Sequence, residues 1–315
     1  MIINRFLLLC CFVSSCSTIN EDINTPVVEQ NIDCQYLLKD FTVLASDELQ
    51  GRKTQTEGSI LAQNFLITQL QQHKILPFQG IYRHPFTIPH KELIGSNVVA
   101  YVKGHQKLNK IIVISAHYDH LGTTSMQQVF NGADDNASGT AAVLTLAKQI
   151  IREPLKHDVI FLFTDAEELG LQGSKAFLRE IGSFRENIIL NVNLDMLAGS
   201  NEQNTLYTIN QNLSKILSLE HLERLKLLQR SFKPKVLANF KRARGSLLND
   251  RINFRKASDH SAFNHYKIPY IYFGVGTHKN YHTINDTFEN ANTNLYVKNV
   301  QNIFKQLIYL DNSVD

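Results

Sequence analysis

The residues of this 315-residue chain best suited to chemistry are histidines and carboxylates that lie directly after apolar runs. They fall in five short stretches, and the candidates are His117 with Asp119, Asp134 with Asp135, Asp165 with Glu167 and Glu168, Asp195, and His282. Imidazole and carboxylate ligands without thiolates are typical of a catalytic zinc site rather than a closed structural one. The sequence therefore predicts a metal site assembled from distant segments.

Each stretch alone also has a plainer explanation. A histidine after a strand is more often structural than a ligand, and the adjacent acids Asp134 and Asp135 would be favourable as caps at a helix N-terminus. The acids of 165–168 would suit an exposed loop. Asp195 is harder to explain, because a carboxylate in an apolar context is costly to bury unless it is paired or metal-bound. The five stretches together favour metal binding.

The elements that must position these residues alternate along the chain. Apolar runs predict strands at 97–102, 111–115, 159–163, 188–194 and 268–275, and helical spacing predicts helices at 36–45, 60–70, 137–151, 174–180 and 295–310. This alternation predicts an α/β fold with a mostly parallel central sheet flanked by helices. Open α/β sheets bind ligands at the carboxyl ends of their strands, where the candidate residues lie.

Residues 201–257 interrupt the alternation and predict an insertion. An amphipathic helix is expected over 213–228, and eight basic residues then lie between 233 and 256 beside one acid, Asp250. Two interpretations stay open. The insertion is either a cap that brings positive charge to a substrate, or a solvated surface segment.

Composition excludes several classes of protein. The chain has 32 basic and 29 acidic residues, and this balance is too even to indicate a nucleic-acid partner. Four cysteines are too few for a disulfide scaffold, and an apolar content of 43% excludes global disorder.

The five stretches resemble, in their order and residue identities, the motifs of the di-zinc aminopeptidases of metallopeptidase family 28. This family includes bacterial leucyl aminopeptidases and aminopeptidase Y. The resemblance spans roughly residues 35–310 and includes Ala-Ser-Asp-Glu-Leu-Gln-Gly-Arg at 45–52. It implies the zinc-exopeptidase type of α/β fold (phosphorylase/hydrolase-like) and two zinc ions per chain. The implied ligands are His117 and Asp195 for one ion, Glu168 and His282 for the other, and Asp135 between them.

The resemblance also implies roles for neighbouring residues. Glu167 would be the general base, Asp119 would orient His117, and Asp134 would not bind metal. Because the adjacent Glu167 and Glu168 need different roles, we expect an irregular strand end there. A stretch at 257–263 matches the family too, so Asp259 and His260 are expected to line the site and aid the oxyanion, or else to cap and pack a short helix.

The expected function is a zinc-dependent exopeptidase, an aminopeptidase that removes N-terminal residues from peptides. Glu167 would take a proton from the attacking water and pass it to the leaving amine. One alternative is a glutaminyl-peptide cyclotransferase with one zinc, and another is a carboxypeptidase that uses the basic residues of 233–256 as an anchor. A third, of another class, is a non-catalytic membrane-anchored binding lipoprotein. The expected partners are a peptide substrate and, through a lipid, a membrane.

The N-terminus predicts a lipoprotein signal peptide over residues 1–15. Arg5 precedes an apolar run at 6–13, which is far shorter than the roughly 20 residues of a membrane-spanning helix. Ser14 and Ser15 then precede Cys16, which resembles the lipidated cysteine of bacterial lipoproteins; an ordinary signal peptide and a buried helix are the alternatives. Residues 16–30 predict a tether and 31–315 a zinc peptidase domain, in the bacterial cell envelope at the periplasmic side of the outer membrane or secreted to the periplasm.

Overall fold

The structure is a computed structural model that describes residues 31–238 and 253–314. The predicted signal peptide, Cys16 and the tether lie outside the described residues, as do Asp250 and half of the basic residues of the insertion, namely Lys241, Arg242, Arg244 and Arg251. No helix among the described residues is both long and apolar enough to cross a membrane.

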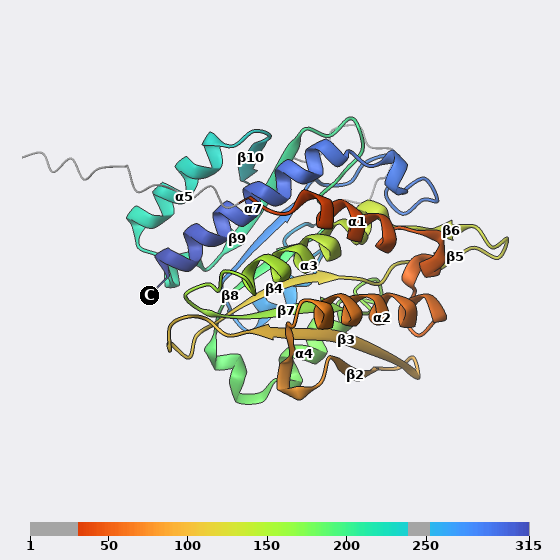
Figure 1. The fold of residues 1–315 in the computed structure, drawn as a ribbon, viewed down its shortest axis with the longest axis horizontal. Helices are drawn as coiled ribbons and strands as arrows, with labels where there is room; N and C mark the ends of the chain where they lie inside the picture. The colour runs from red at the N-terminus through yellow and green to blue at the C-terminus, as the bar shows by residue number, and fades with distance from the viewer. Residues whose placement is uncertain (1–30, 239–252, 315) are drawn as a thin grey trace, which may run out of the picture. The chain divides into compact units, whose positions relative to one another are not determined.

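A nine-stranded sheet forms the centre of the fold (Figure 1). Its middle strands are parallel neighbours, in the order β7 (Asp158–Thr164), β4 (Ile111–His117), β8 (Ile188–Leu194) and β11 (Tyr270–Gly274). Antiparallel strands extend one side, namely β3 (Leu93–Val102), β2 (Arg83–Ile88) and β1 (Leu76–Pro77). The predicted mostly parallel central sheet is confirmed.

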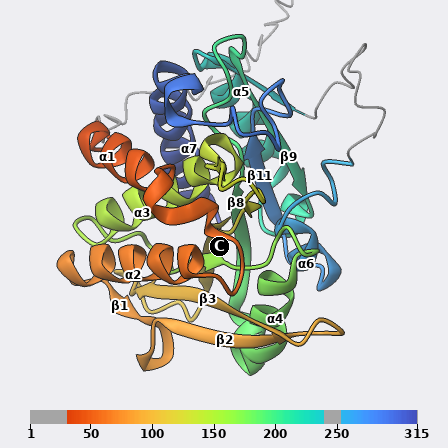
Figure 2. The ribbon, with the colours of Figure 1, turned by 90° about the vertical axis from the view of Figure 1, so that its right-hand side faces the viewer.

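Helices cover both faces of this sheet (Figure 2). One face carries α1 (Cys34–Leu44), α2 (Glu57–Gln72), α3 (Gly139–Ile150), α5 (Leu219–Ser231) and α7 (Thr293–Ser313), and the other carries α4 (Gln172–Glu180) and α6 (His260–His265). Side chains of a strand alternate between the faces, so Ile112 and Ile114 of β4 join one core cluster while Ile111 and Val113 join the other. Burial on both faces explains the continuous apolar runs of these strands.

Short elements connect the main ones. They are the single-turn helices η1 (Asp47–Arg52), η2 (Phe78–Gly80), η4 (Gly182–Asn187), η5 (Leu213–Lys215) and η6 (Phe288–Asn290), the irregular turn η3 (Ala133–Ser138), and a hairpin of β5 (Gly122–Thr123) and β6 (Val129–Phe130). The stretch at 45–52 that resembles the family is partly helical, since η1 covers most of it.

As far as residue 238, the predicted insertion does not form a cap. β9 (Thr205–Gln211) pairs antiparallel with β11, and β10 (Lys235–Ala238) pairs parallel with β9, so this segment extends the central sheet. It does so because Leu206 and Val236 are buried in the core. The helix expected from residue 213 begins at Leu219, where the Ser218 side chain accepts a hydrogen bond from the His221 N–H.

Candidate metal centre

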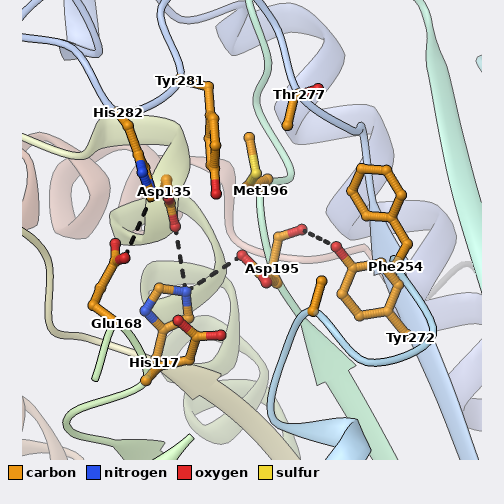
Figure 3. A pocket seen from close by; sticks show the side chains of 12 residues that line it. His117, Asp135, Glu168, Asp195, Met196, Phe254, Tyr272, Thr277, Tyr281 and His282 are labelled. Atoms are coloured by element: carbon orange, nitrogen blue, oxygen red, sulfur yellow. Dashed lines mark hydrogen bonds and ion pairs between the residues drawn. The ribbon is translucent and has the colours of Figure 1, made fainter. Parts of the chain in front are cut away.

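All five predicted metal ligands and Glu167 line one pocket at the carboxyl ends of β4, β7 and β8 (Figure 3). The pocket is lined by His117, Asp135, Glu167, Glu168, Asp195, Met196, Phe254, Ala257, Tyr272, Thr277, Tyr281 and His282. The ligands come from four loops and the end of β4, so their meeting depends on the fold of the whole sheet.

The first group of ligands surrounds His117, the last residue of β4. Its Nε2 lies 3.3 Å from Asp135 Oδ1 and 3.4 Å from Asp195 Oδ1, and Asp195 Oδ1 is buried without a hydrogen-bond partner among the described residues. A tetrahedral zinc ion with its usual bond lengths spaces its ligand atoms about 3.3–3.5 Å apart. These residues therefore fit a zinc ion.

The second group lies on the other side of Asp135. His282 Nε2 is 3.0 Å from Asp135 Oδ2 and 3.5 Å from Glu168 Oε2, spacings that also suit ligands of one ion. The two oxygens of Asp135 thus face two different ligand groups. This is the arrangement expected of a carboxylate that bridges a metal pair.

His120 is a residue of this site that the sequence analysis did not assign. Its Nδ1 lies 2.9 Å from Glu168 Oε1 and 4.0 Å from Asp135 Oδ2. The longer distance exceeds the ligand spacing of a tetrahedral zinc site. His120 is therefore best described as a donor to Glu168 Oε1, which leaves Glu168 Oε2 facing His282; its position three residues after His117 was the available signal.

Asp119 supports the two glutamates through their main chain. Its Oδ1 accepts a hydrogen bond from the Glu167 N–H (3.0 Å) and its Oδ2 accepts one from the Glu168 N–H (3.3 Å). Oδ1 also lies 3.7 Å from His117 Nδ1. The chain leaves β7 irregularly, with Ala166 at a positive φ of 57°, as the different roles of Glu167 and Glu168 require.

Two further carboxylates join the loops behind the ligands. Asp286 accepts hydrogen bonds from the N–H groups of Asp134 (2.9 Å) and Asp135 (3.1 Å), which ties the loop of His282 to the turn of Asp135. Asp134 lies 2.9 Å from His278 Nε2 and also accepts from the Ala198 and Gly199 N–H groups. Neither acid lines the pocket, and each lies behind a metal ligand.

Asp259 and His260, expected to contact substrate, do not line the pocket either. Asp259 is buried and accepts a hydrogen bond from the Thr164 hydroxyl at 2.5 Å. His260 Nε2 lies 3.0 Å from the Phe254 carbonyl oxygen, and burial lowers the pKa of His260 to about 4. These contacts match the alternative packing role, since a neutral His260 supports Phe254, which does line the pocket.

The pocket is acidic and has an apolar wall. Met196, Phe254 and Ala257 supply apolar surface, and Tyr281 stacks on His282 with ring centroids 3.9 Å apart. Figure 3 shows the Tyr281 hydroxyl pointing toward the ligand cluster. No lysine or arginine of the described ranges contributes to the lining.

Mutual charge shifts the titration of these groups. Burial, assisted by the charges of Asp195 and Asp259, raises the pKa of Glu167 well above its ordinary value, although the charge of His117 opposes this. Burial disfavours the protonated imidazole of His282, but its contacts with Asp135 and Glu168 raise its pKa to about 10. The pKa of His117 is likewise raised, despite burial, by the charge of Glu167 and by its carboxylate contacts.

The fold and the site together define an α/β protein with a candidate metal site at the carboxyl ends of its parallel strands. The family model of Peptidase family M28 matches residues 97–307, and the chain belongs to that family. This agrees with the resemblance seen in the sequence.

Curated relatives share part of the chain. It is 29% identical over 167 residues to the alkaline phosphatase isozyme conversion protein of Escherichia coli, covering 47% of each protein. It is 33% identical over 113 residues to leucine aminopeptidase 2 of Trichophyton rubrum, covering 35% of this chain and 21% of that protein. The chain thus spans less than half the length of these curated relatives.

Solved structures with the same fold are more distant in sequence. A leucine aminopeptidase precursor from Bacteroides thetaiotaomicron has a TM-score of 0.69 at 17% identity, covering 89% of this chain and 98% of that one. A Porphyromonas gingivalis glutaminyl cyclase has a TM-score of 0.67 at 15% identity, covering 88% and 98%. At these identities the likeness establishes the fold.

Replacing His120 with phenylalanine should weaken one metal position and spare the other. The His120→Phe variant lacks the donor to Glu168, so we expect zinc affinity at the Glu168–His282 position to fall roughly 10–100-fold. Zinc titration against a competing chelator measures both positions. The exposed His105→Phe variant is the control, and equal affinities in the His120 variant and the native protein would contradict the assignment.

Zinc binding at pH 7 should release protons. The raised pKa values of His117 and His282 keep both imidazoles protonated in the metal-free protein, and zinc binds the neutral ring. Zinc affinity should therefore rise with pH from neutrality toward the pKa of His282, about 10. Titration calorimetry at pH 7 in buffers of different ionisation enthalpy measures this release, and binding heats independent of the buffer would refute it.

Proposed function

We propose that the protein is a zinc-dependent aminopeptidase that binds two zinc ions and removes N-terminal residues from peptides. The observation that carries this proposal is the geometry of Asp135, whose two oxygens face separate ligand groups 3.3 and 3.0 Å away. Membership of Peptidase family M28 supports hydrolysis of peptide bonds. The similarity to leucine aminopeptidase 2 supports exopeptidase action.

The side chains around the ligands have the properties that peptide hydrolysis needs. Bound zinc would supply Lewis acidity that polarises a carbonyl and activates water near neutral pH. Glu167 is half-buried beside the ligands, and its raised pKa suits a group that accepts a proton from water and then donates it to the leaving amine. The Tyr281 hydroxyl points toward the ligands and is placed to donate a hydrogen bond to the substrate carbonyl oxygen.

The acidic lining favours recognition of a free amine. Four carboxylates line the pocket, namely those of Asp135, Glu167, Glu168 and Asp195. Bound zinc ions would offset much of this negative charge, but the carboxylate oxygens can still accept hydrogen bonds from a protonated N-terminus, whereas the C-terminal carboxylate needed by a carboxypeptidase requires a cationic partner. The basic residues of 233–256 within the described ranges are absent from the lining, so those described offer no carboxylate anchor.

Two alternatives have weaker support. A glutaminyl cyclase with one zinc shares the fold, but here both ligand groups are complete, including the His117–Asp195 pair. A non-catalytic binding protein would have no need for Glu167 beside a complete ligand set.

The apolar wall of Met196, Phe254 and Ala257 suits an apolar side chain at the substrate N-terminus.

Replacing Glu167 with glutamine should separate catalysis from metal binding. Glu167→Gln keeps the shape of the side chain but removes the proton acceptor, so hydrolysis should fall by at least 100-fold while zinc content stays unchanged. Aminoacyl-amide hydrolysis and zinc content are measured on the same sample. The exposed Glu202→Gln variant, which loses only a surface pair with Lys279, is the control.

A substrate panel distinguishes the candidate activities. Free-amine, N-blocked and N-terminal glutamine peptides are compared with the native protein and Glu167→Gln. Hydrolysis limited to free-amine substrates with two zinc ions per chain supports the proposal. Ammonia release from glutamine peptides with one zinc indicates the cyclase, and native-like turnover by Glu167→Gln excludes that residue as the base.

We further propose that the protein is a lipoprotein attached through Cys16 to the bacterial cell envelope, with the outer membrane favoured. Support comes from the sequence: an apolar run at 6–13, then Ser14 and Ser15 before Cys16. Cleavage and lipidation at Cys16 would leave the polar residues 17–30 as the tether to the folded domain.

Replacing Cys16 should release the protein from membranes. In the native host or a related bacterium, the native chain should fractionate with membranes and carry a lipid detectable by mass spectrometry at Cys16. Cys16→Ser should fractionate as a soluble protein, because it lacks the acceptor thiol. Cys11→Ser, altered within the predicted signal, is the matched control; membrane fractionation of Cys16→Ser equal to that of the native chain would overturn the proposal.

A further inference from the structure

Arg52 is a buried cation that the proposed chemistry does not use. Its side chain is fully buried, and it donates hydrogen bonds to four main-chain carbonyl oxygens. Nε donates to Tyr118 (2.7 Å), Nη1 to Asn131 (2.6 Å) and to Leu44, and Nη2 to Gly132 (2.9 Å). Within residues 31–238 and 253–314, these hydrogen bonds go to carbonyl oxygens and none goes to a carboxylate. A buried guanidinium held only by carbonyls requires an explanation, because buried arginines are usually paired.

The carbonyls bound by Arg52 flank the predicted ligands. Tyr118 stands between His117 and Asp119, while Asn131 and Gly132 lead into the turn that carries Asp135. Between these two segments the chain leaves the sheet through the β5–β6 hairpin. The guanidinium therefore links the two ends of this loop and fixes the two ligand-bearing segments relative to each other.

The segment that carries Arg52 fits tightly against the hairpin. A Cβ on Gly51 would lie 2.3 Å from the Gly122 carbonyl oxygen and 2.6 Å from that of Phe130, so only glycine allows this approach. A second contact joins the two segments: the Asn131 side chain donates a hydrogen bond of 2.7 Å to Asp47 Oδ1. Arg52 itself has a φ of 50°, a costly conformation that the surrounding contacts must maintain.

The positive charge of Arg52 lies near the predicted ligand carboxylates, but Arg52 makes no hydrogen bond to their oxygens. Burial lowers its pKa to about 10, opposed by the charges of Asp286, Asp135, Asp119 and Glu168, so it remains cationic near neutral pH. A cation paired directly with these carboxylates would compete with zinc for their oxygens. A cation held by carbonyls reduces their mutual repulsion and leaves the oxygens available.

We propose that Arg52 is a positioning residue of the metal centre, which fixes the spacing between the His117–Asp119 segment and Asp135 before metal binds. The inference rests on the metal site required by the proposed function, but it concerns zinc affinity rather than catalysis. A protein that binds zinc tightly without peptidase activity would refute the proposed function and leave this inference to its own test.

Arginine is required here because of its shape as well as its charge. The planar guanidinium directs several N–H groups outward in a fixed fork, whereas the lysine ammonium is one compact donor on a flexible stem. Arg52→Lys therefore keeps the charge but cannot hold both segments. We expect it to lower zinc affinity roughly 10–100-fold, as loss of supporting contacts does at other metal sites.

A matched control separates positioning from general loss of stability. Lys148 is also a buried cation, paired with Asp40 at 2.6 Å between α1 and α3, and neither residue lines the pocket. Lys148→Met should destabilise the fold, as measured by urea unfolding, yet bind zinc with native affinity. Asp47→Ala, at an exposed position, loses the hydrogen bond to Asn131 and should show a smaller loss of affinity than Arg52→Lys.

Zinc affinity is measured by chelator competition on full-length protein, and ligand geometry by the visible absorption of the cobalt-substituted protein. The inference predicts a lowered affinity and an altered cobalt spectrum for Arg52→Lys, and a native spectrum for Lys148→Met. Native affinity and spectrum in Arg52→Lys would overturn it. If Arg52→Lys does not fold, the zinc affinity of Asp47→Ala is the test instead. Native zinc affinity in that variant would also overturn the inference.

Discussion

Mutual repulsion of buried carboxylates is the constraint on which this site depends. Asp135, Glu168 and Asp195 meet in a pocket mostly enclosed by protein, where like charges interact strongly. Cations must compensate, and in the metal-free protein the protonated rings of His117 and His282 do so, as their raised pKa values indicate. Zinc ions would replace those protons. The parallel strands make the arrangement possible, because their carboxyl ends bring loops distant in sequence to one edge of the sheet.

The charged residues behind the predicted ligands, here called the supporting layer, bind mainly to main-chain atoms. Asp119, Asp134 and Asp286 each accept hydrogen bonds from main-chain N–H groups, and Arg52 donates to main-chain carbonyls. These charged groups are thereby satisfied largely by peptide dipoles, although Asp134 also pairs with His278. As a result, the carboxylate and imidazole groups that face the pocket are left to bind metal. This layer also joins the loop of His282 to the turn of Asp135 through Asp286.

The sequence predicted the ligands better than their supports. Residues such as Asp195 could be found because a carboxylate directly after a buried strand is costly without a partner, and because the stretches resemble one family. His120 and Arg52 act through contacts that only the tertiary structure creates, so their residue types alone gave no role. His260 lay in a matching stretch, yet burial turned it into a neutral support for Phe254. The sheet-extending strand β9 was missed because the polar, partly exposed residues at its ends weaken the apolar pattern.

Glu167 and Glu168 illustrate how environment, rather than residue type, assigns a role. The carboxylate of Asp119 holds both residues, because it accepts hydrogen bonds from both of their N–H groups. For Glu168, burial and the charge of Asp135 favour the neutral form, but hydrogen bonds from His120 and His282 prevail and lower its pKa. Burial raises the pKa of Glu167, and the charges of Asp195, Asp259 and Glu168 add to this effect, although the charge of His117 opposes it. Glu168 is thus suited to remain ionised as a predicted ligand, and Glu167 is suited to carry a proton.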